Sequence, residues 1–476
     1  MKKTVTADKP IGTHTPLLWL VAVGFFMQTL DGTIINTALP AMARSLGESP
    51  LRMQSVVVAY SLTMAMLIPA SGWLADRFGT RRVFFGAIIL FVLGSVLCSA
   101  SKSLGMLVAS RVIQGAGGAM LLPVGRLTLM RVVPRTEFLQ AMSFVAIPGL
   151  VGPLIGPTLG GWLVQYATWH WIFLINVPVG LIGCAATLWA MPDVRGVTRR
   201  GFDLAGYVML ACGMVAISLA LDGLSELGLR QITVLVLLVF GFALITGYWL
   251  HAARTDEPLF PPTLFKVYTY SIGLLGNLFS RLGSSCMPFL LPLLLQVSLD
   301  YSPLRAGMTL LPSAIAGMLM KRAATPLILR WGYRRVLVLN TLLVGLATAS
   351  FSAAAPGYPT LALLAQMLIF GAVNSLQFTA MNTVTLAGLD ASGASAGNSL
   401  FSMMQMLAMS MAVAAAASVL AGYHDIFRAQ GASGTLHAFQ ATFATMGLVT
   451  IASALIFWFL PPKTAMGTGA DISARE

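Results

Sequence analysis

The sequence predicts an all-α integral membrane protein, and three observations support this fold class. The chain of 476 residues is 57% hydrophobic and only 9% charged, with a mean hydropathy of +0.82, whereas a soluble domain carries about 25% charged residues. Apolar runs of the length that a helix needs to cross a bilayer recur along the whole chain. Lysine and arginine gather in alternate loops between these runs. Together these features predict a multi-pass bundle of transmembrane helices.

Fourteen apolar runs are long enough to span the bilayer, and the seventh and the glycine-rich twelfth are the least distinct. They cover residues 17–37, 54–74, 83–99, 104–125, 139–163, 171–190, 204–222, 231–250, 270–296, 304–328, 336–354, 360–387, 397–420 and 438–460. An even number of spans places both termini on one side of the membrane. The first run follows Lys2 and Lys3 as in a signal peptide, but its length and Asp31 favour an uncleaved span.

The formal net charge of +13 is a topology signal. Of the 29 lysines and arginines, 18 fall on the side of the N-terminus and six fall in the opposite loops. Short cytoplasmic loops carry this excess in membrane proteins, so we expect both termini in the cytoplasm. The basic charge therefore does not predict a nucleic-acid partner.

The sequence favours a transporter over the other classes of membrane protein. It has no G-x-x-x-x-G-K-[ST] loop, its five histidines are scattered, and its four cysteines fall inside predicted spans. We therefore expect no cofactor, no metal site and no enzyme activity. No loop is long enough for the output domain of a sensor, and no repeated filter predicts a channel. We expect a monomer that moves a small molecule at the expense of an ion gradient, with a passive channel or a sensor as remote alternatives.

An internal repeat divides the chain. "DRFGTRRV" at 76–83 resembles "LRWGYRRV" at 329–336, and the offset of 253 residues also carries the first, fourth and fifth runs onto the ninth, twelfth and thirteenth. Basic turns alone would not explain this register, whereas a transporter built from two like halves would. We expect a six-helix bundle at 1–191, two inserted helices with their loops at 192–269, a second six-helix bundle at 270–461 and a cytoplasmic tail at 462–476.

Five segments along the chain carry the motifs of one family. They are "LDGTIINTALP" (30–40), "GWLADRFGTRR" (72–82), "RVIQGAGGAM" (111–120), "GLVGPLIGPTLGG" (149–161) and "WHWIFLINVPVG" (169–180). The chain thus resembles the major facilitator superfamily, in its branch of fourteen-helix drug/proton antiporters, and "GFDLAGYVML" (201–210) resembles the seventh helix of that branch. The resemblance implies the major facilitator fold in a bacterial inner membrane and multidrug efflux by proton antiport, and hence antibiotic resistance.

The second segment resembles the gate loop of this family. Its signature positions hold Gly72, Asp76, Arg77, Gly79 and Arg81. The resemblance implies that Asp76 latches the cytoplasmic gate through an arginine, for which Arg126 and Arg131 are the candidates. The second copy has Leu329 in place of Asp76, so we expect the latch on one side only. A solvated, charged turn is the alternative.

Asp31 lies well inside the first span, where a charge costs about 3 kcal/mol. Counted along each helix at about 1.5 Å per residue, Asp31 and Arg111 of the fourth span reach the same depth. We expect the two to meet, and we expect Asp31 to change its protonation state during transport. A static ion pair that only fixes helix packing is the alternative.

The fourth segment is similar to the antiporter motif of the superfamily. Its small and helix-bending residues are Gly149, Gly152, Pro153, Gly156, Pro157, Gly160 and Gly161. Four of the glycines recur at spacings of three and four residues, which forms one smooth helix face that lets another helix approach closely. A smooth helix between two bundles can seal or slide, and an ordinary packing stripe is the alternative.

Polar residues inside the spans are candidates for a substrate cavity. They are Gln28, Asp31, Gln114, Asn176, Asn277, Arg281, Gln296, Asn374, Gln377 and Gln405. Subtraction of the repeat offset places Arg281 at Gln28, so we expect both to face one cavity. Once Asp31 and Arg111 pair, Arg281 is an excess cation, which favours an organic anion such as citrate or metal-citrate over a drug-like cation. Alternatively, Arg281 reaches helix-end carbonyls or water.

Overall fold

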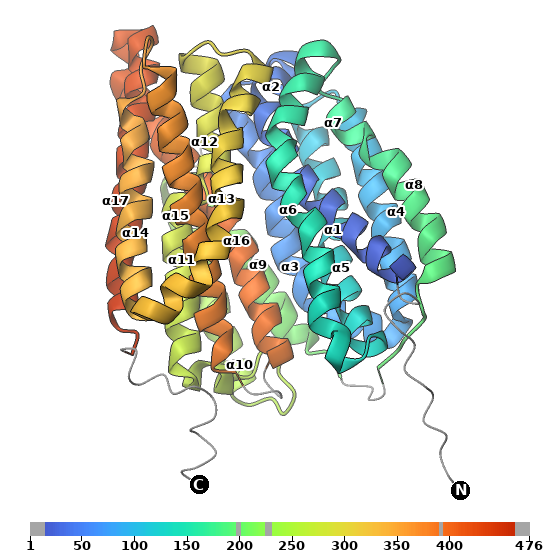
Figure 1. The fold of residues 1–476 in the computed structure, drawn as a ribbon. Helices are drawn as coiled ribbons and strands as arrows, with labels where there is room; N and C mark the ends of the chain where they lie inside the picture. The colour runs from blue at the N-terminus through green and yellow to red at the C-terminus, as the bar shows by residue number, and fades with distance from the viewer. Residues whose placement is uncertain (1–14, 197–200, 224–230, 390–393, 462–476) are drawn as a thin grey trace, which may run out of the picture.

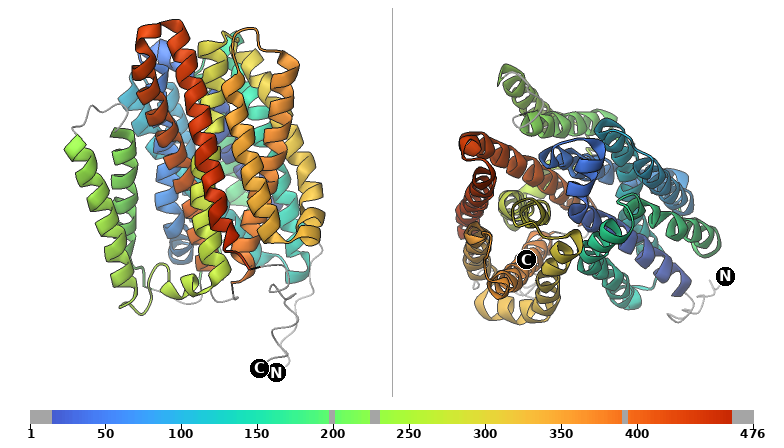
Figure 2. Two further views of the ribbon diagram at one scale, coloured as in Figure 1. Left: turned by 90° about the vertical axis from the view of Figure 1, so that its left-hand side faces the viewer. Right: turned by 90° about the horizontal axis from the view of Figure 1, so that it is seen from above.

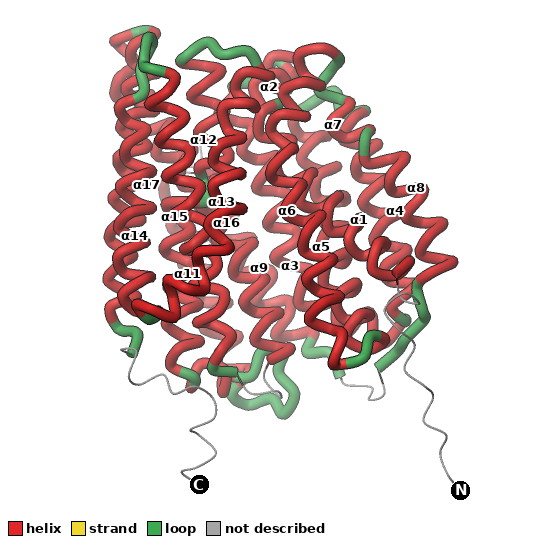
Figure 3. The backbone as a smooth tube through the Cα atoms, in the orientation of Figure 1, coloured by secondary structure: helices red, strands yellow, loops and turns green. Residues whose placement is uncertain are grey.

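The structure is a computed structural model that describes residues 15–196, 201–223, 231–389 and 394–461, so the expected tail at 462–476 lies outside it. The described residues form helices and no strand (Figure 3). The long helices are α1 (Thr15–Ile34), α3 (Gln54–Phe78), α4 (Thr80–Ser99), α5 (Leu104–Val132), α6 (Arg135–Tyr166), α8 (Asn176–Ala190), α9 (Leu204–Gly223), α10 (Gln231–Ala252), α11 (Tyr268–Ser284), α13 (Pro303–Trp331), α14 (Tyr333–Ser350), α15 (Thr360–Ala387), α16 (Ala394–Phe427) and α17 (Ala432–Trp458). Three short helices are α2 (Leu39–Leu46), α7 (Trp171–Leu174) and α12 (Met287–Leu293).

Every one of the fourteen expected spans coincides with helix. Thirteen helical segments in the described part of the chain are long and apolar enough to cross a membrane. The remaining expected span, 304–328, is α13, which has the length of a span but whose apolar residues are interrupted by Arg305, Lys321 and Arg322. The chain is therefore a multi-pass, all-helical membrane protein.

Three spans are broken where the sequence predicts one helix, and a proline follows each break. Pro40 follows a 3₁₀ turn at Ile35–Thr37, Pro178 follows the break between α7 and α8, and Pro288 follows the break between α11 and α12. Proline lacks the amide hydrogen that would bond the carbonyl four residues earlier, so the helix restarts at these points. By contrast, α6 continues through Pro148, Pro153 and Pro157.

The helices pack in two sets that meet along two seams. In the first set α1 packs on α6, and α5 packs on α3 and α4; in the second, α13 packs on α15, and α14 and α11 pack on α17. The sets meet where α6 packs on α13 and where α3 packs on α16, as Figure 1 shows. Both views of Figure 2 place α9 and α10 together at the edge of the bundle, where α9 contacts α3 and α16. The four-part division of the chain stays a prediction.

The repeated turn has the same backbone in both copies. Gly79 ends α3 with φ +95°, and Gly332 ends α13 with φ +79°. A residue with a side chain is strained at such angles, so the glycine that the two sequence copies share is required by the turn.

Hydrogen bonds of Asp203 connect the start of α9 with the end of α10, at the lower end of the bundle in Figure 1. Asp203 accepts hydrogen bonds from the Gly206 amide at 2.8 Å, from the Leu259 amide at 3.2 Å and from His251 Nε2 at 2.7 Å. Burial would raise the pKa of Asp203, but these hydrogen bonds outweigh it and hold the pKa below its ordinary value. Asp203 thus ties the start of α9 to the end of α10 and to the segment that leads into α11.

Candidate functional site

A buried ion pair joins α1 to α5. Arg111 Nη1 donates to Asp31 Oδ2 at 2.7 Å, and each of the two side chains is only 1% exposed. Because both charges are out of water, each depends on the other and on hydrogen bonds for its stability. The two side chains therefore meet, as their depths in the sequence predict. The role of the pair in proton coupling stays a prediction.

Two amides complete the bonding of Asp31. Gln114 Nε2 donates to Asp31 Oδ1 at 2.7 Å and to Ser95 Oγ at 2.9 Å, while Gln114 Oε1 accepts from Arg111 Nη1 at 2.6 Å. Asn176 Nδ2 donates to Asp31 Oδ1 at 3.2 Å from the first turn of α8. Side chains of α5 and α8 thus bind the carboxylate of α1, Ser95 of α4 binds the two amides, and both Gln114 and Asn176 are buried.

Sequence reasoning missed three side chains of this site. Ser95 of α4 supports the amides, and the rings of Tyr60 and Phe173 lie 4.1 and 5.8 Å from the Arg111 guanidinium carbon. A lone hydroxyl in the apolar run "FVLGSVL" was the only signal for Ser95. The sequence gives no signal for Tyr60 and Phe173, because an aromatic residue in a span most often faces lipid or packs in the core.

The glycine face of α6 packs against α1. A Cβ atom at Gly152 would lie 2.5 Å from Thr29 Oγ1, and added Cβ atoms at Gly149, Gly156 and Gly160 would likewise meet α1. Gly161 faces the other way, where its Cβ would overlap the backbone at Pro303 of α13. Gly307 of α13 in turn has no room for a Cβ because of the Pro157 carbonyl. Hence α6 lies against side chains and backbone of α1 on one face and directly against the backbone of α13 on the other.

The gate loop contains the expected ion pair, and its arginine is Arg131. Arg131 Nη2 binds Asp76 Oδ1, whereas Arg126 has a buried Nε with no partner among the described residues. Arg77 stacks on Trp73 of the same helix, and the guanidinium carbon lies 5.5 Å from the ring centre. Nothing lies within 4 Å of a Cβ placed at Gly72.

The segment after α8 docks on the gate loop. Arg81 Nε donates to the Met191 carbonyl, and the Thr80 amide donates to the Val194 carbonyl at 3.1 Å. The segment that leads to the inserted helices is therefore bonded to the turn between α3 and α4.

Hydrogen bonds join the two helix sets at the end of the bundle that carries α2, the upper end of Figure 1. Gln296 Nε2 donates to the Thr37 carbonyl at 2.9 Å, and the Leu304 amide donates to Gln165 Oε1 at 3.3 Å. Gln296, expected in the cavity, thus contacts the backbone of the opposite set. A buried apolar cluster with residues of α2 and of α12 packs at the same end.

Arg281 contacts residues of the second helix set. Its Nε donates to Asn277 Oδ1 at 2.6 Å, and its guanidinium carbon lies 4.8 Å from the ring centre of Phe378. No ion pair of Arg281 occurs among the described residues. Gln28 and Asn374 are both partly buried, and Gln405 donates to Asn382 at 2.7 Å.

Gln377 belongs to a separate, neutral cluster. Its Oε1 accepts from Asn340 Nδ2 at 2.8 Å, and its Nε2 donates to Thr341 Oγ1 at 2.7 Å and to Ser280 Oγ at 3.3 Å. All four side chains are buried. The cavity candidates therefore divide between the Asp31 network, this neutral cluster and the contacts described above.

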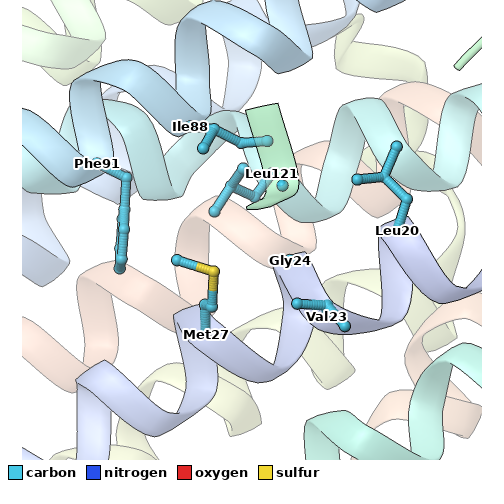
Figure 4. A pocket seen from close by; sticks show the side chains of 8 residues that line it. Leu20, Val23, Gly24, Met27, Ile88, Phe91 and Leu121 are labelled. Carbon is cyan, nitrogen blue, oxygen red and sulfur yellow. The ribbon is translucent and has the colours of Figure 1, made fainter. Parts of the chain in front are cut away.

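A small apolar pocket lies beside the Asp31 network. Figure 4 shows side chains of α1, α4 and α5 around it. Its lining is Leu20, Val23, Gly24, Met27, Ile88, Phe91, Leu121 and Gly183. Met27 and Phe91 precede Asp31 and Ser95 by one helical turn, so the pocket is one turn from the polar network but contains none of its groups.

The fold and the buried charges define a membrane transporter, and comparison with known proteins gives its family. A model of the Major Facilitator Superfamily matches residues 21–413, and the chain belongs to this family. It is 52% identical over 450 residues, 94% of each chain, to "Putative multidrug resistance protein MdtD" of Serratia proteamaculans (strain 568). It is 49% identical over 455 residues, 96% of each chain, to the protein of the same name from Yersinia enterocolitica. The protein is therefore a secondary transporter and not an enzyme.

Solved structures with little sequence similarity share the fold. The human organic anion transporter MFSD10 (TETRAN) is 15% identical with a TM-score of 0.61, over 94% of this chain and 100% of that chain. A POT family transporter in complex with 5-aminolevulinic acid is 14% identical with a TM-score of 0.65, over 94% and 95% of the two chains.

Proposed function

We propose that this transporter exports small, drug-like molecules across the bacterial inner membrane in exchange for protons, as a monomer with both termini in the cytoplasm. The bias of lysine and arginine toward the loops on the side of the N-terminus supports this orientation. The names of the relatives, putative multidrug resistance proteins, support drug-like substrates. The observation that carries the proposal is the buried pair of Asp31 and Arg111.

Asp31 is suited to couple proton exchange to movement because its bonds to neighbouring helices differ between its two charge states. As a carboxylate it accepts bonds from Arg111, Gln114 and Asn176. As a carboxylic acid it loses its attraction to Arg111, and the bonds that hold α1 to α5 weaken. Proton binding at Asp31 therefore changes the force between two helices.

The packing offers a route from Asp31 to the opposite helix set. Asp31 lies on α1, α1 packs on the glycine face of α6, and α6 contacts α13 through Gly161 and Gly307. Because the glycines leave no free space at either contact, a shift of α1 displaces α6 and then α13. In the proposed cycle the two six-helix bundles, 1–191 and 270–461, rock about a central site, and the bonds at the α2 end break when the outer side opens.

Proton flux in vesicles that hold the purified transporter tests this function. We expect ethidium to drive proton movement through the wild type and through Asp300→Asn, and none through Asp31→Asn. Asp300 is an exposed loop residue with φ +54°, a conformation that asparagine also tolerates, so it is a matched control. Proton-coupled ethidium flux that survives Asp31→Asn would disprove the coupling role of Asp31.

Organic anions such as citrate or metal-citrate are the second candidate substrate, and Arg281 is the observation that favours them. Its guanidinium is held by an amide and a ring, and no carboxylate neutralises it among the described residues. An arginine in this state can bind a substrate carboxylate. In the same vesicles, proton movement driven by citrate and lost in Arg281→Gln would favour anions. Ethidium-driven movement that is indifferent to Arg281→Gln would favour drug-like cations.

A further inference from the structure

We infer that Tyr60 is a positioning residue of the proton-coupling site: its ring holds the Arg111 guanidinium in place in both protonation states of Asp31. The inference rests on the proposed proton antiport and adds a residue to it. Tyr60 lies on α3, which contributes no polar side chain to the bonding of Asp31 described above. Its ring centre is 4.1 Å from the Arg111 guanidinium carbon, and its side chain is buried.

The hydroxyl group of Tyr60 does not explain why it is there. Tyr60 Oη is buried and has no hydrogen-bond partner among the described residues. A buried hydroxyl without a partner destabilises the folded protein. The compensating interaction is that of the ring face, because a cation over a desolvated aromatic ring is attracted to it.

Two glycines of α5 seat Tyr60 against Arg111. A Cβ at Gly115 would lie 2.9 Å from the Tyr60 carbonyl, and a Cβ at Gly118 would lie 2.7 Å from Tyr60 Oη. Both glycines belong to the segment "RVIQGAGGAM", which also supplies Arg111 and Gln114. The same short stretch of α5 thus provides the cation and the space for the ring that stacks on it.

The ring matters most when Asp31 is protonated. Arg111 then retains two hydrogen bonds, from Nη1 to Gln114 Oε1 and from Nε to the Val56 carbonyl at 3.3 Å. Among the described residues, the other groups that stabilise the guanidinium charge are the aromatic rings of Tyr60 and Phe173. The other titratable groups around Asp31 are Arg111 from α5, Tyr60 itself from α3 and Cys98 from α4; α8 supplies the neutral Asn176, and α6 supplies glycines. The face of the ring stabilises the cation that is left without its carboxylate when Asp31 is protonated, so loss of the ring should weaken proton binding at Asp31.

The test follows the protonation of Asp31 directly and needs no substrate. Infrared spectra of the purified transporter across a pH series report the carbonyl stretch of a protonated carboxyl group, and Asp31→Asn identifies the band by removing it. We expect Tyr60→Phe, which keeps the ring, to titrate at the pH of the wild type. We expect Tyr60→Leu to titrate about one pH unit lower, a tenfold loss of proton affinity. An unshifted Tyr60→Leu, or a Tyr60→Phe that shifts as far as Tyr60→Leu, would overturn the inference.

A second pair of variants covers the case in which Tyr60→Leu does not fold. In Gly118→Ala the added Cβ would lie 2.7 Å from Tyr60 Oη and 3.3 Å from the nearest ring carbon, so the steric clash is with the hydroxyl oxygen. We expect Gly118→Ala to lower the titration pH and the double variant Gly118→Ala with Tyr60→Phe to restore it, because the phenylalanine lacks the atom that is pushed. A double variant that stays as shifted as Gly118→Ala would contradict the role of the ring.

The two proposals fail in different ways. If no carboxyl band titrates, or if Asp31→Asn leaves the titrating band in place, the proton-coupling role of Asp31 fails. If the band belongs to Asp31 and Tyr60→Leu leaves its midpoint unchanged, only the inference on Tyr60 fails.

Discussion

Each of the two helix sets buries a polar cluster, and among the described residues the cluster of the first set contains an ion pair whereas that of the second set is neutral. In the first set Asp31 and Arg111 form an ion pair at 2.7 Å that two amides support. In the second set Gln377 links Asn340, Thr341 and Ser280 through neutral hydrogen bonds. The repeat offset maps Asp31 onto Ser284 and Arg111 onto Leu364, so the second set has neither charge at the equivalent positions.

This difference separates two uses of buried polar groups. A neutral cluster specifies how helices pack, and its charge is the same at every pH of interest. A buried ion pair changes its interaction energy when one member takes a proton, so it can drive movement. The two helix sets thus differ in charge at equivalent positions, and the proposed proton coupling involves the first set only.

The largest expected effect comes from breaking the ion pair on one side. Arg111→Gln leaves Asp31 as a buried carboxylate without its cation, and we expect a loss of about 4 kcal/mol in the free energy of unfolding. Unfolding of the purified protein by SDS in mixed micelles measures it. The double variant with Asp31→Asn removes the stranded charge, so we expect it to recover most of the loss. If the double variant is no more stable than Arg111→Gln, the unpaired Asp31 carboxylate is not the cause of the lost stability.

Removal of one member of the neutral cluster should reduce the free energy of unfolding by a smaller amount. Gln377→Leu leaves Thr341 and Asn340 short of one partner each, and we expect a loss of about 1–2 kcal/mol on the same SDS unfolding curve. The pH dependence of ethidium-driven proton flux should match the wild type. A shifted pH profile would break the comparison, because the neutral cluster would then take part in coupling.

The contact between α1 and α6 can be disturbed without touching any charge. Gly152→Ala places a Cβ 2.5 Å from Thr29 Oγ1 and 2.7 Å from the Leu30 nitrogen, so α1 must shift. We expect about 1–2 kcal/mol of destabilisation and a reduced rate of proton-coupled flux. Gly32→Ala is the control on α1, because nothing lies within 4 Å of its added Cβ. Equal effects of the two variants would mean that the close approach of α6 is unimportant.

The smallest expected effect concerns Asp203, a charged group outside both clusters. Its pKa is held below the ordinary value, so the stability it contributes is present above that ordinary pKa and is lost as pH falls through the lowered one. Asp203→Asn keeps a residue that caps helices well, and we expect it to cost about 1 kcal/mol at neutral pH. Melting temperatures of the two proteins should converge in strong acid. A gap that widens toward acid pH would contradict the assigned sign.

The sequence by itself determined the class of fold and much of the charged site. Composition and fourteen apolar runs predicted a helical membrane bundle, because a bilayer tolerates few alternatives to helices of that length. The depths of Asp31 and Arg111 follow from the regular rise of a helix. Because these depths are equal, they predicted the contact that the structure shows. The glycines of α6 predicted one smooth face, since their spacing matches the helical period.

Only the tertiary structure decided which groups surround these residues. The sequence did not choose between Arg126 and Arg131, because both lie near the depth of Asp76 and the choice depends on how α5 is rotated. It also did not predict Ser95 and Tyr60 beside the ion pair, nor that the smooth face of α6 meets α1 while Gly161 meets α13. The depth of a residue in the membrane follows from its position along the helix, because the rise per residue is fixed. The direction in which its side chain faces depends on how the helix is rotated against the neighbours that pack on it.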